Sequence, residues 1–312
     1  MFFMIRNSFI ILTAFVLILV GAHCSIDEPD PDNDQNKHEL PVGKGKLKVL
    51  AIGNSFVDDP MACFDDIVQA SGIDCSKLCI YAASVGNTSL QYWADKCASG
   101  EQVTIKRYSG QLDMAVTKAP LKELLAQDWD VVTVQQLSSL AQDSTSLLPP
   151  LPYLVSQIRE NCPNKGVVIA FQQVWSYWLW DQSSLSNWER ITEVVKLTLG
   201  YGVDMIIPTG TAIQNARGTE LNTQHELTRD SVHLCYGAGQ YVAACTWFEA
   251  LLAPVFGISV LGNTATHEIT EEEMAESEFE TVAVTDLNRT LCQQCATAAV
   301  KHPFLITPVT SL

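Results

Sequence analysis

After residue 23 the sequence contains no apolar run long enough to span a membrane, which takes about 20 residues. Positive charge is also scarce, because 19 lysines and arginines stand against 35 aspartates and glutamates, giving a formal net charge of −16. Such a surplus of negative charge repels phosphate backbones. We therefore expect no nucleic-acid partner.

Several common catalytic and metal-binding motifs are missing. Val57 stands where a Gly-x-Ser-x-Gly elbow would need its last glycine, and there is no Gly-x-x-x-x-Gly-Lys phosphate loop. The segment 225–229 begins His-Glu but lacks the second histidine of a zinc protease helix. Cys292 and Cys295 have metal-like spacing but no second ligand pair, which favours a buried helix face or a local disulfide. We expect neither a metal site nor a cofactor.

The first 24 residues have the pattern of an export signal. Residues 1–23 carry one charge, Arg6, followed by apolar residues and then small ones before Cys24. Cys24 resembles the lipid-modified cysteine of bacterial lipoproteins, although His23 occupies the place where Gly or Ala is usual. We expect export to the cell envelope with a lipid anchor at Cys24 as the only membrane contact, on the periplasmic or the outer-surface side. Secretion after cleavage nearby is the alternative.

Residues 25–45 form a second compositional region. They include six acidic residues and three prolines and have almost no apolar side chains, so they are expected to be a disordered acidic tether. Residues 46–312 then have the length of one large domain, and an apolar content of 47% can fill a sizeable core. Removal of the leader with its single charge would change the net charge from −16 to −17.

Two further disulfide pairings are open among the ten cysteines, since an exported chain can oxidise its thiols. The candidate pairs are Cys75 with Cys79 and Cys63 with Cys97. Cys235 and Cys245 lie in apolar stretches, where thiols simply pack.

Strand-like and helix-like patterns alternate from residue 46 onward. Strands are expected at 47–52, 78–83, 130–135, 166–171 and 203–207, and helices at 60–70, 88–98, 115–126, 150–161 and 187–200. The strands are almost continuously apolar, which indicates burial on both faces, and their alternation with helices predicts right-handed crossovers around a parallel sheet. Later helices are expected at 237–252 and 286–301, with a capping box at Thr270.

Two fragments far apart in the chain indicate chemistry. Gly53-Asn54-Ser55-Phe56 follows the first strand, and Asp230-Ser231-Val232-His233 precedes a long apolar helix. A serine nucleophile needs a base and a carboxylate that orients the base, and an Asp three residues before a His can supply both. Alternatively, Ser55 and Asp230 cap the helices that follow them and His233 packs in the interior. The joint pattern favours Ser55, His233 and Asp230 as a catalytic triad.

Four blocks in order resemble the SGNH, or GDSL-type, hydrolase superfamily, and within it a little-characterised bacterial subgroup. They are Gly53–Phe56, Gly86-Asn87 after the second strand, Gln135-Gln136 ending the third, and Asp230–His233. The resemblance implies an α/β fold, a three-layer α/β/α sandwich around a mostly parallel five-stranded sheet of flavodoxin-like type. It also implies an esterase whose oxyanion hole includes the main-chain amides of Ser55 and Gly86. The superfamily's third donor is an Asn side chain, and here we favour Gln136 over Gln135, because alternate strand residues face opposite sides.

The substrate is harder to identify from the sequence. Trp175 and Trp178 follow a predicted strand, and their rings could stack on sugars or cover the domain edge. Candidate substrate contacts are therefore Asn54, Gln135, Trp175, Trp178 and Arg217. Arg217 and Arg229 could instead pair with carboxylates such as Asp204 or Glu226.

The best functional hypothesis is removal of acetyl groups from carbohydrate, by analogy with deacetylases of the superfamily. Alternatives are a lipase or thioesterase and a non-catalytic glycan-binding protein of the same fold. The oligomeric state stays open.

Overall fold

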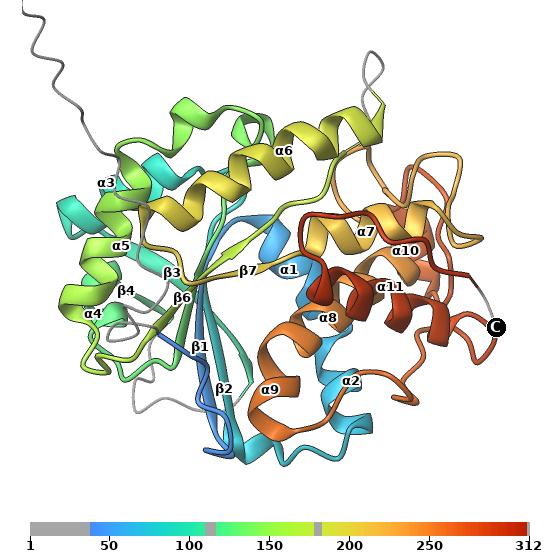
Figure 1. Ribbon diagram of the computed structural model, residues 1–312, viewed down its shortest axis with the longest axis horizontal. Coiled ribbons are helices and arrows are strands. Elements are labelled where there is room, and N and C mark those ends of the chain that lie inside the picture. The colour runs from blue at the N-terminus through green and yellow to red at the C-terminus, as the bar shows by residue number, and fades with distance from the viewer. Residues whose placement is uncertain (1–37, 110–116, 178–182, 311–312) are drawn as a thin grey trace, which may run out of the picture. The chain divides into compact units, whose positions relative to one another are not determined.

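A seven-stranded mixed sheet organises the chain from residue 47 onward (Figure 1). The structure is a computed structural model that describes residues 38–109, 117–177 and 183–310. The predicted leader, Cys24 and most of the predicted tether lie outside the described residues. The strand order is β4-β3-β2-β1-β5-β6-β7. The strands are β1 (Leu47–Gly53), β2 (Leu78–Ser84), β3 (Gln102–Ser109), β4 (Lys118–Pro120), β5 (Val131–Val134), β6 (Val168–Gln172) and β7 (Met205–Ile207).

All five predicted strands are present, and β2, β1, β5, β6 and β7 pair in parallel. The expected total of five is wrong, because β3 and β4 add two antiparallel strands at one edge. β3 was missed because its exposed positions carry polar and charged residues, so it lacks the continuous apolar run of a central strand. The predicted helix 115–126 is also corrected: Lys118–Pro120 is a strand, and the helix α4 covers only Leu121–Leu125.

Helices flank both faces of the sheet (Figure 1). One face carries α1 (Ser55–Ala62), α2 (Phe64–Ala70), α7 (Thr209–Arg217), α8 (Ala238–Trp247), α9 (Ala253–Phe256) and α11 (Arg289–Lys301). The other carries α3 (Leu90–Ser99), α4, α5 (Pro150–Asn161) and α6 (Ser184–Thr198). The predicted helix 237–252 comprises α8 and a π-helical turn at Phe248–Leu252. The predicted capping box is present at Thr270, at the start of α10 (Glu271–Glu276).

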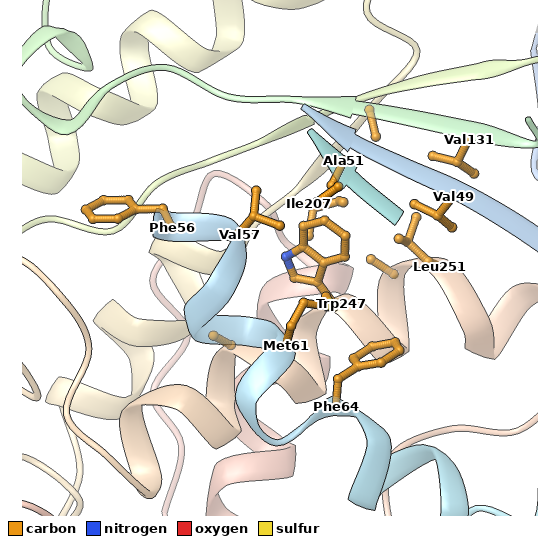
Figure 2. Packing of buried hydrophobic residues seen from close by; sticks show 14 of the residues in the cluster. Val49, Ala51, Phe56, Val57, Met61, Phe64, Val131, Ile207, Trp247 and Leu251 are labelled. Atoms are coloured by element: carbon orange, nitrogen blue, oxygen red, sulfur yellow. The ribbon is translucent and has the colours of Figure 1, made fainter. Parts of the chain in front are cut away.

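The core beneath β1 is formed by α1 and α8. Figure 2 shows Val57 and Met61 of α1 pointing toward Trp247 of α8, while Phe56 points to the other side of α1. Trp247 is 1% exposed and Val57 fully buried. Burying such a side chain contributes about 1.5–3 kcal/mol, so this contact fixes α1 against the sheet and against α8.

The strand order reverses direction at β1. The chain goes from β1 to β2 on one side and then returns to β5 on the other. The carboxyl ends of β1 and β5 therefore border a topological switch point, where open α/β sheets bind ligands. The residues that follow these two strands include Ser55 and Gln135.

The cysteines of the described residues are all free thiols. The two open disulfide pairings are therefore not formed, and Cys63 and Cys97 are buried in the core. Cys292 and Cys295 lie on the buried face of α11. Within the described ranges, no cluster of His, Cys, Asp and Glu could hold a metal ion, and no helix is long and apolar enough to cross a membrane.

Candidate active site

Ser55, His233 and Asp230 form a continuous hydrogen-bonded relay. The Nε2 atom of His233 lies 2.8 Å from Ser55 Oγ, and its Nδ1 atom lies 2.6 Å from Asp230 Oδ2. The side chains of His233 and Asp230 are 26% and 32% exposed, so the relay is open to solvent. The structure thus joins residues from the first helix and from a loop more than half the chain away.

A tight turn explains how Asp230 reaches His233. Asp230 Oδ1 accepts hydrogen bonds from the main-chain N–H groups of Val232 at 3.1 Å and His233 at 2.7 Å. Ser231 lies between Asp230 and Val232 and has a φ of 69°, in the left-handed region that residues other than glycine seldom adopt. One carboxylate oxygen therefore shapes the turn while the other holds the ring.

The same contacts set the charge states. Burial alone would raise the pKa of the Asp230 carboxyl, but the hydrogen bonds from the ring and main chain of His233 outweigh burial and hold that pKa well below its usual range. The hydrogen bond to Asp230 raises the pKa of His233, against the opposing effect of burial. The negative charge of Asp59 raises it further, and Arg229 lowers it. The pair is thus arranged to stabilise an imidazolium beside a carboxylate.

The turn that carries Ser55 is held from beneath by two glutamines. Asn54 caps α1, accepting the N–H of Phe56 at 3.1 Å, and its Oδ1 also accepts Gln135 Nε2 at 2.7 Å. Gln172 Nε2 donates to the Phe56 carbonyl at 2.9 Å. That carbonyl lacks its usual helical partner, because the residue one turn later is Pro60, which has no N–H.

Asn54 and Gln135 therefore support the turn from within the protein. They are 2% and 1% exposed, which corrects the expectation that they are substrate contacts. Gly53 is required here, since a Cβ at this position would lie 2.7 Å from Gln135 Cδ. No sequence motif marks Gln172 for this role.

The main-chain amides of Ser55 and Gly86 follow the adjacent strands β1 and β2. Val85 N–H donates to the Gly53 carbonyl at 3.2 Å, and Ser84 Oγ donates to the Asn54 carbonyl at 3.2 Å, so the turn after β2 is tied to the turn after β1. Ser55 is the first residue of α1, where N–H groups have no helical acceptor. Among the described residues, no acceptor bonds to the N–H of Gly86 either, and Gly86 is exposed. Both amides are available to an incoming oxygen.

Gln136 does not fill the place expected for it. Its Nε2 donates to the carbonyl and Oγ of Ser146 at 3.2 and 2.9 Å, and its Oε1 accepts the N–H of Leu90 at 3.1 Å. The amide is thus used to join α3 to the loop after β5. The expected third oxyanion donor is corrected to a structural role.

Trp175 supports the loop 229–234 that carries His233, called the histidine loop below. It is fully buried, which corrects the expectation that its ring contacts a substrate. Its Nε1 donates to the Val232 carbonyl at 2.8 Å, and its ring stacks on Phe56 with centroids 4.0 Å apart. Phe56 in turn makes a T-shaped contact with the ring of His233, with centroids 5.8 Å apart. Trp178 lies outside the described residues.

Arg217 is buried as well and binds protein groups only. It donates to the Glu226 carbonyl at 2.9 Å, to the Ser176 carbonyl and hydroxyl, and to Gln214 Oε1. Burial lowers the pKa of Arg217 to about 10. The proposed substrate contact is therefore wrong for this residue.

The alternative partners expected for the arginines also differ from those observed. Asp204 pairs with Arg159, and Arg229 pairs with Asp59 at 2.7 Å. Glu226 contributes only its main-chain carbonyl to Arg217, while its carboxylate accepts the hydroxyl of Ser184 at 2.9 Å.

Comparison with known proteins places the chain in a family. The crystal structure of a DUF4886 family protein from Bacteroides uniformis is 28% identical, with a TM-score of 0.66 over 85% of this chain and 98% of that one. A candidate SGNH hydrolase from Slackia heliotrinireducens is 16% identical, with a TM-score of 0.44 over 64% of this chain and 96% of that one. No curated protein matches the chain significantly in sequence. The family model described as "Domain of unknown function (DUF4886)" matches residues 48–278, and the chain therefore belongs to the DUF4886 family.

Proposed function

We propose that the protein is a serine hydrolase that cleaves carboxylic esters. The observation that carries the proposal is the relay from Ser55 through His233 to Asp230, with bonds of 2.8 and 2.6 Å. A serine that merely capped α1 would not need a histidine at its hydroxyl, and here the cap is Asn54. The arrangement has the geometry that nucleophilic acyl transfer requires.

In the proposed reaction Ser55 Oγ attacks the ester carbonyl carbon while His233 Nε2 takes the hydroxyl proton. The tetrahedral oxyanion accepts hydrogen bonds from the N–H groups of Ser55 and Gly86. As the C–O bond to the alcohol breaks, His233 returns the proton to the leaving oxygen. Water then attacks the acyl-serine with His233 again as base, releasing the acid and restoring Ser55.

For the substrate class we propose acetyl esters of carbohydrate, and for the location the cell envelope, with an anchor at Cys24. The first rests on the resemblance to a superfamily that contains carbohydrate deacetylases, and the second on the leader pattern. Trp175 and Arg217 lend the carbohydrate assignment no support, because both are buried.

The test is release of acetate from acetylated oligosaccharides, compared with hydrolysis of p-nitrophenyl esters of increasing acyl length and of acyl thioesters. Preference for acetyl over longer chains supports the assignment. Preference for long acyl chains or thioesters would replace it with a lipase or thioesterase. Absence of Ser55-dependent turnover, with glycan binding retained, would favour a binding protein.

The acid limb of the pH profile follows from the state of His233. The base must be neutral to accept a proton, and the hydrogen bond to Asp230 raises the pKa of His233 above its ordinary value of 6.5. We therefore expect kcat/KM to rise with pH with a midpoint above 6.5. A steady-state pH series measures it, and a midpoint below that value would contradict the described charge balance.

Trp175→Phe should lower turnover clearly while lowering the free energy of unfolding only slightly. The variant keeps the stacking ring but loses the hydrogen bond to the Val232 carbonyl, worth about 1 kcal/mol, so the histidine loop is held less firmly. We expect turnover to fall roughly tenfold from the displaced base.

Trp129→Phe is the matched control, because Trp129 is equally buried and donates its Nε1 to the Leu124 carbonyl at 2.6 Å, a contact outside the relay. Trp129→Phe should show a similar loss of unfolding free energy, measured by urea denaturation, but unchanged turnover. Equal effects of both variants on turnover would refute a specific role for Trp175.

A further inference from the structure

Asp59 is a buried carboxylate that the triad itself does not use. It lies on α1 one helical turn after Ser55, so both side chains project from the same face of the helix. Its side chain is 2% exposed. A buried carboxylate is costly unless it is paired and hydrogen-bonded, and this one is bound entirely by groups from the histidine loop and from α8.

The hydrogen bonds of Asp59 hold the main chain next to His233. Oδ2 accepts the main-chain N–H of Leu234 at 3.0 Å, and Oδ1 accepts Arg229 Nη1 at 2.7 Å and Gln240 Nε2 at 3.1 Å. Arg229 also donates to the Leu234 carbonyl, and its own N–H donates to the His233 carbonyl at 2.9 Å. Both main-chain polar groups of Leu234 are therefore held, directly or through Arg229, by one carboxylate.

The histidine loop thus meets α1 at two successive points. His233 contacts Ser55, and the next residue, Leu234, contacts Asp59 one turn along the same helix. Gln240 extends the attachment to α8, which packs against α1 beneath the sheet (Figure 1). A hinge at one point would let the imidazole swing, whereas attachment at two points fixes its distance from Ser55.

We propose that Asp59 is a positioning residue for the reaction, holding the histidine loop against α1 through Leu234 and Arg229. This inference rests on the proposed function, in that it assigns Asp59 to the same site. The hydrogen bonds of Asp59 go to Leu234, Arg229 and Gln240, so it acts on the reaction through the position and charge of His233. The Asp59 and Arg229 pair also places a negative and a positive charge beside the imidazole, in addition to Asp230.

The first variants are Asp59→Asn and Arg229→Gln. Asp59→Asn keeps the shape but removes the negative charge and leaves Arg229 unpaired, so the pKa of His233 should fall. Arg229→Gln removes the positive charge and leaves Asp59 unpaired, so the pKa of His233 should rise. Both should lower kcat by about 10²-fold with little change in KM, since a displacement near 1 Å costs that much.

Asp58→Asn is the matched control on the same helix. Asp58 is half-exposed and pairs with Lys106 at 2.7 Å and with the Tyr108 hydroxyl, both on β3. It should leave kcat and the pKa of His233 unchanged. A general weakening of α1 by loss of an acidic residue would instead affect Asp58→Asn and Asp59→Asn alike.

The measurements are kcat and KM, with the pKa of His233 read by NMR titration of the folded proteins. His233→Gln identifies the resonance among those of the six histidines. Opposite pKa shifts with a common loss of kcat support the inference. Turnover and His233 pKa at wild-type values in folded Asp59→Asn overturn it.

A wild-type protein that hydrolyses no ester overturns the proposed function instead, while the titration still decides whether Asp59 sets the state of His233. If Asp59→Asn does not fold, Arg229→Gln decides the positioning, and an unshifted pKa in that variant overturns the inference.

Discussion

Replacement of Ser55 by alanine is expected to lower kcat by on the order of 10⁵- to 10⁶-fold while leaving the fold and substrate binding intact. The hydroxyl is half-buried and makes its hydrogen bond to His233 at 2.8 Å. Asn54 supplies the cap of α1, so loss of the Ser55 hydroxyl does not expose the helix N-terminus. The loss therefore measures chemistry and not folding.

Covalent labelling separates this result from a merely inactive preparation. A fluorophosphonate forms a phosphorus–oxygen bond with an activated serine and releases fluoride, so wild-type protein should gain the adduct at Ser55 and Ser55→Ala should not. Ser89→Ala is the control, because Ser89 is also a helix-end serine, capping α3 through the Tyr92 N–H at 3.3 Å, without a histidine at its hydroxyl. Equal turnover in wild type and Ser55→Ala would refute the proposed mechanism.

The parallel part of the fold could be predicted because its strands have a simple signature. The strands β1, β5 and β6 are buried along nearly their full length, and burial on both faces selects continuous apolar runs. The edge strands β3 and β4 have no such signature. The assignment of β3 depends on its pairing with β2, and that of β4 on its pairing with β3 and on Pro120, which ends the strand just before the helix α4.

The relay could be anticipated because its residues sit in short fragments with recognisable order. Asp230 and His233 are close in sequence. One carboxylate oxygen of Asp230 accepts the His233 N–H within the turn and the other binds the imidazole ring, so local spacing determines the geometry. The remaining site residues depend on tertiary register. Val134 pairs with Ile52, which sets Gln135 beside Gly53 and directs its neighbour Gln136 to Ser146 and Leu90.

Burial of polar side chains was the least predictable feature. Trp175 and Arg217 are residue types that often contact ligands, yet each is buried. Trp175 binds the main chain at Val232, and Arg217 binds the main chain at Ser176. In the sequence Asp59 follows Asp58, and the acidic pair resembles ordinary helix capping. Its partners Arg229, Leu234 and Gln240 lie far along the chain, so only the folded arrangement brings them together.

Asp230→Asn should lower kcat by about 10⁴-fold, a larger loss than any change to the surrounding supports, because the amide can hold the imidazole in the wrong tautomer. The variant keeps an oxygen that can accept the N–H groups of Val232 and His233, so the turn and the fold should persist. Removing the carboxylate also removes the main cause of the raised His233 pKa, and the residual activity should therefore have its acid limb at lower pH.

Asp74→Asn controls for replacement of a turn carboxylate, since Asp74 accepts the Ser76 N–H at 3.0 Å on the surface and has no histidine partner. It should retain wild-type turnover and pH dependence. If Asp230→Asn retained more than about a tenth of wild-type kcat, the carboxylate would only shape the turn. The contacts made by Leu234 and Trp175 would then determine the orientation of His233. The expected loss, together with the downward shift of the acid limb, instead assigns to Asp230 both the position and the charge of the base.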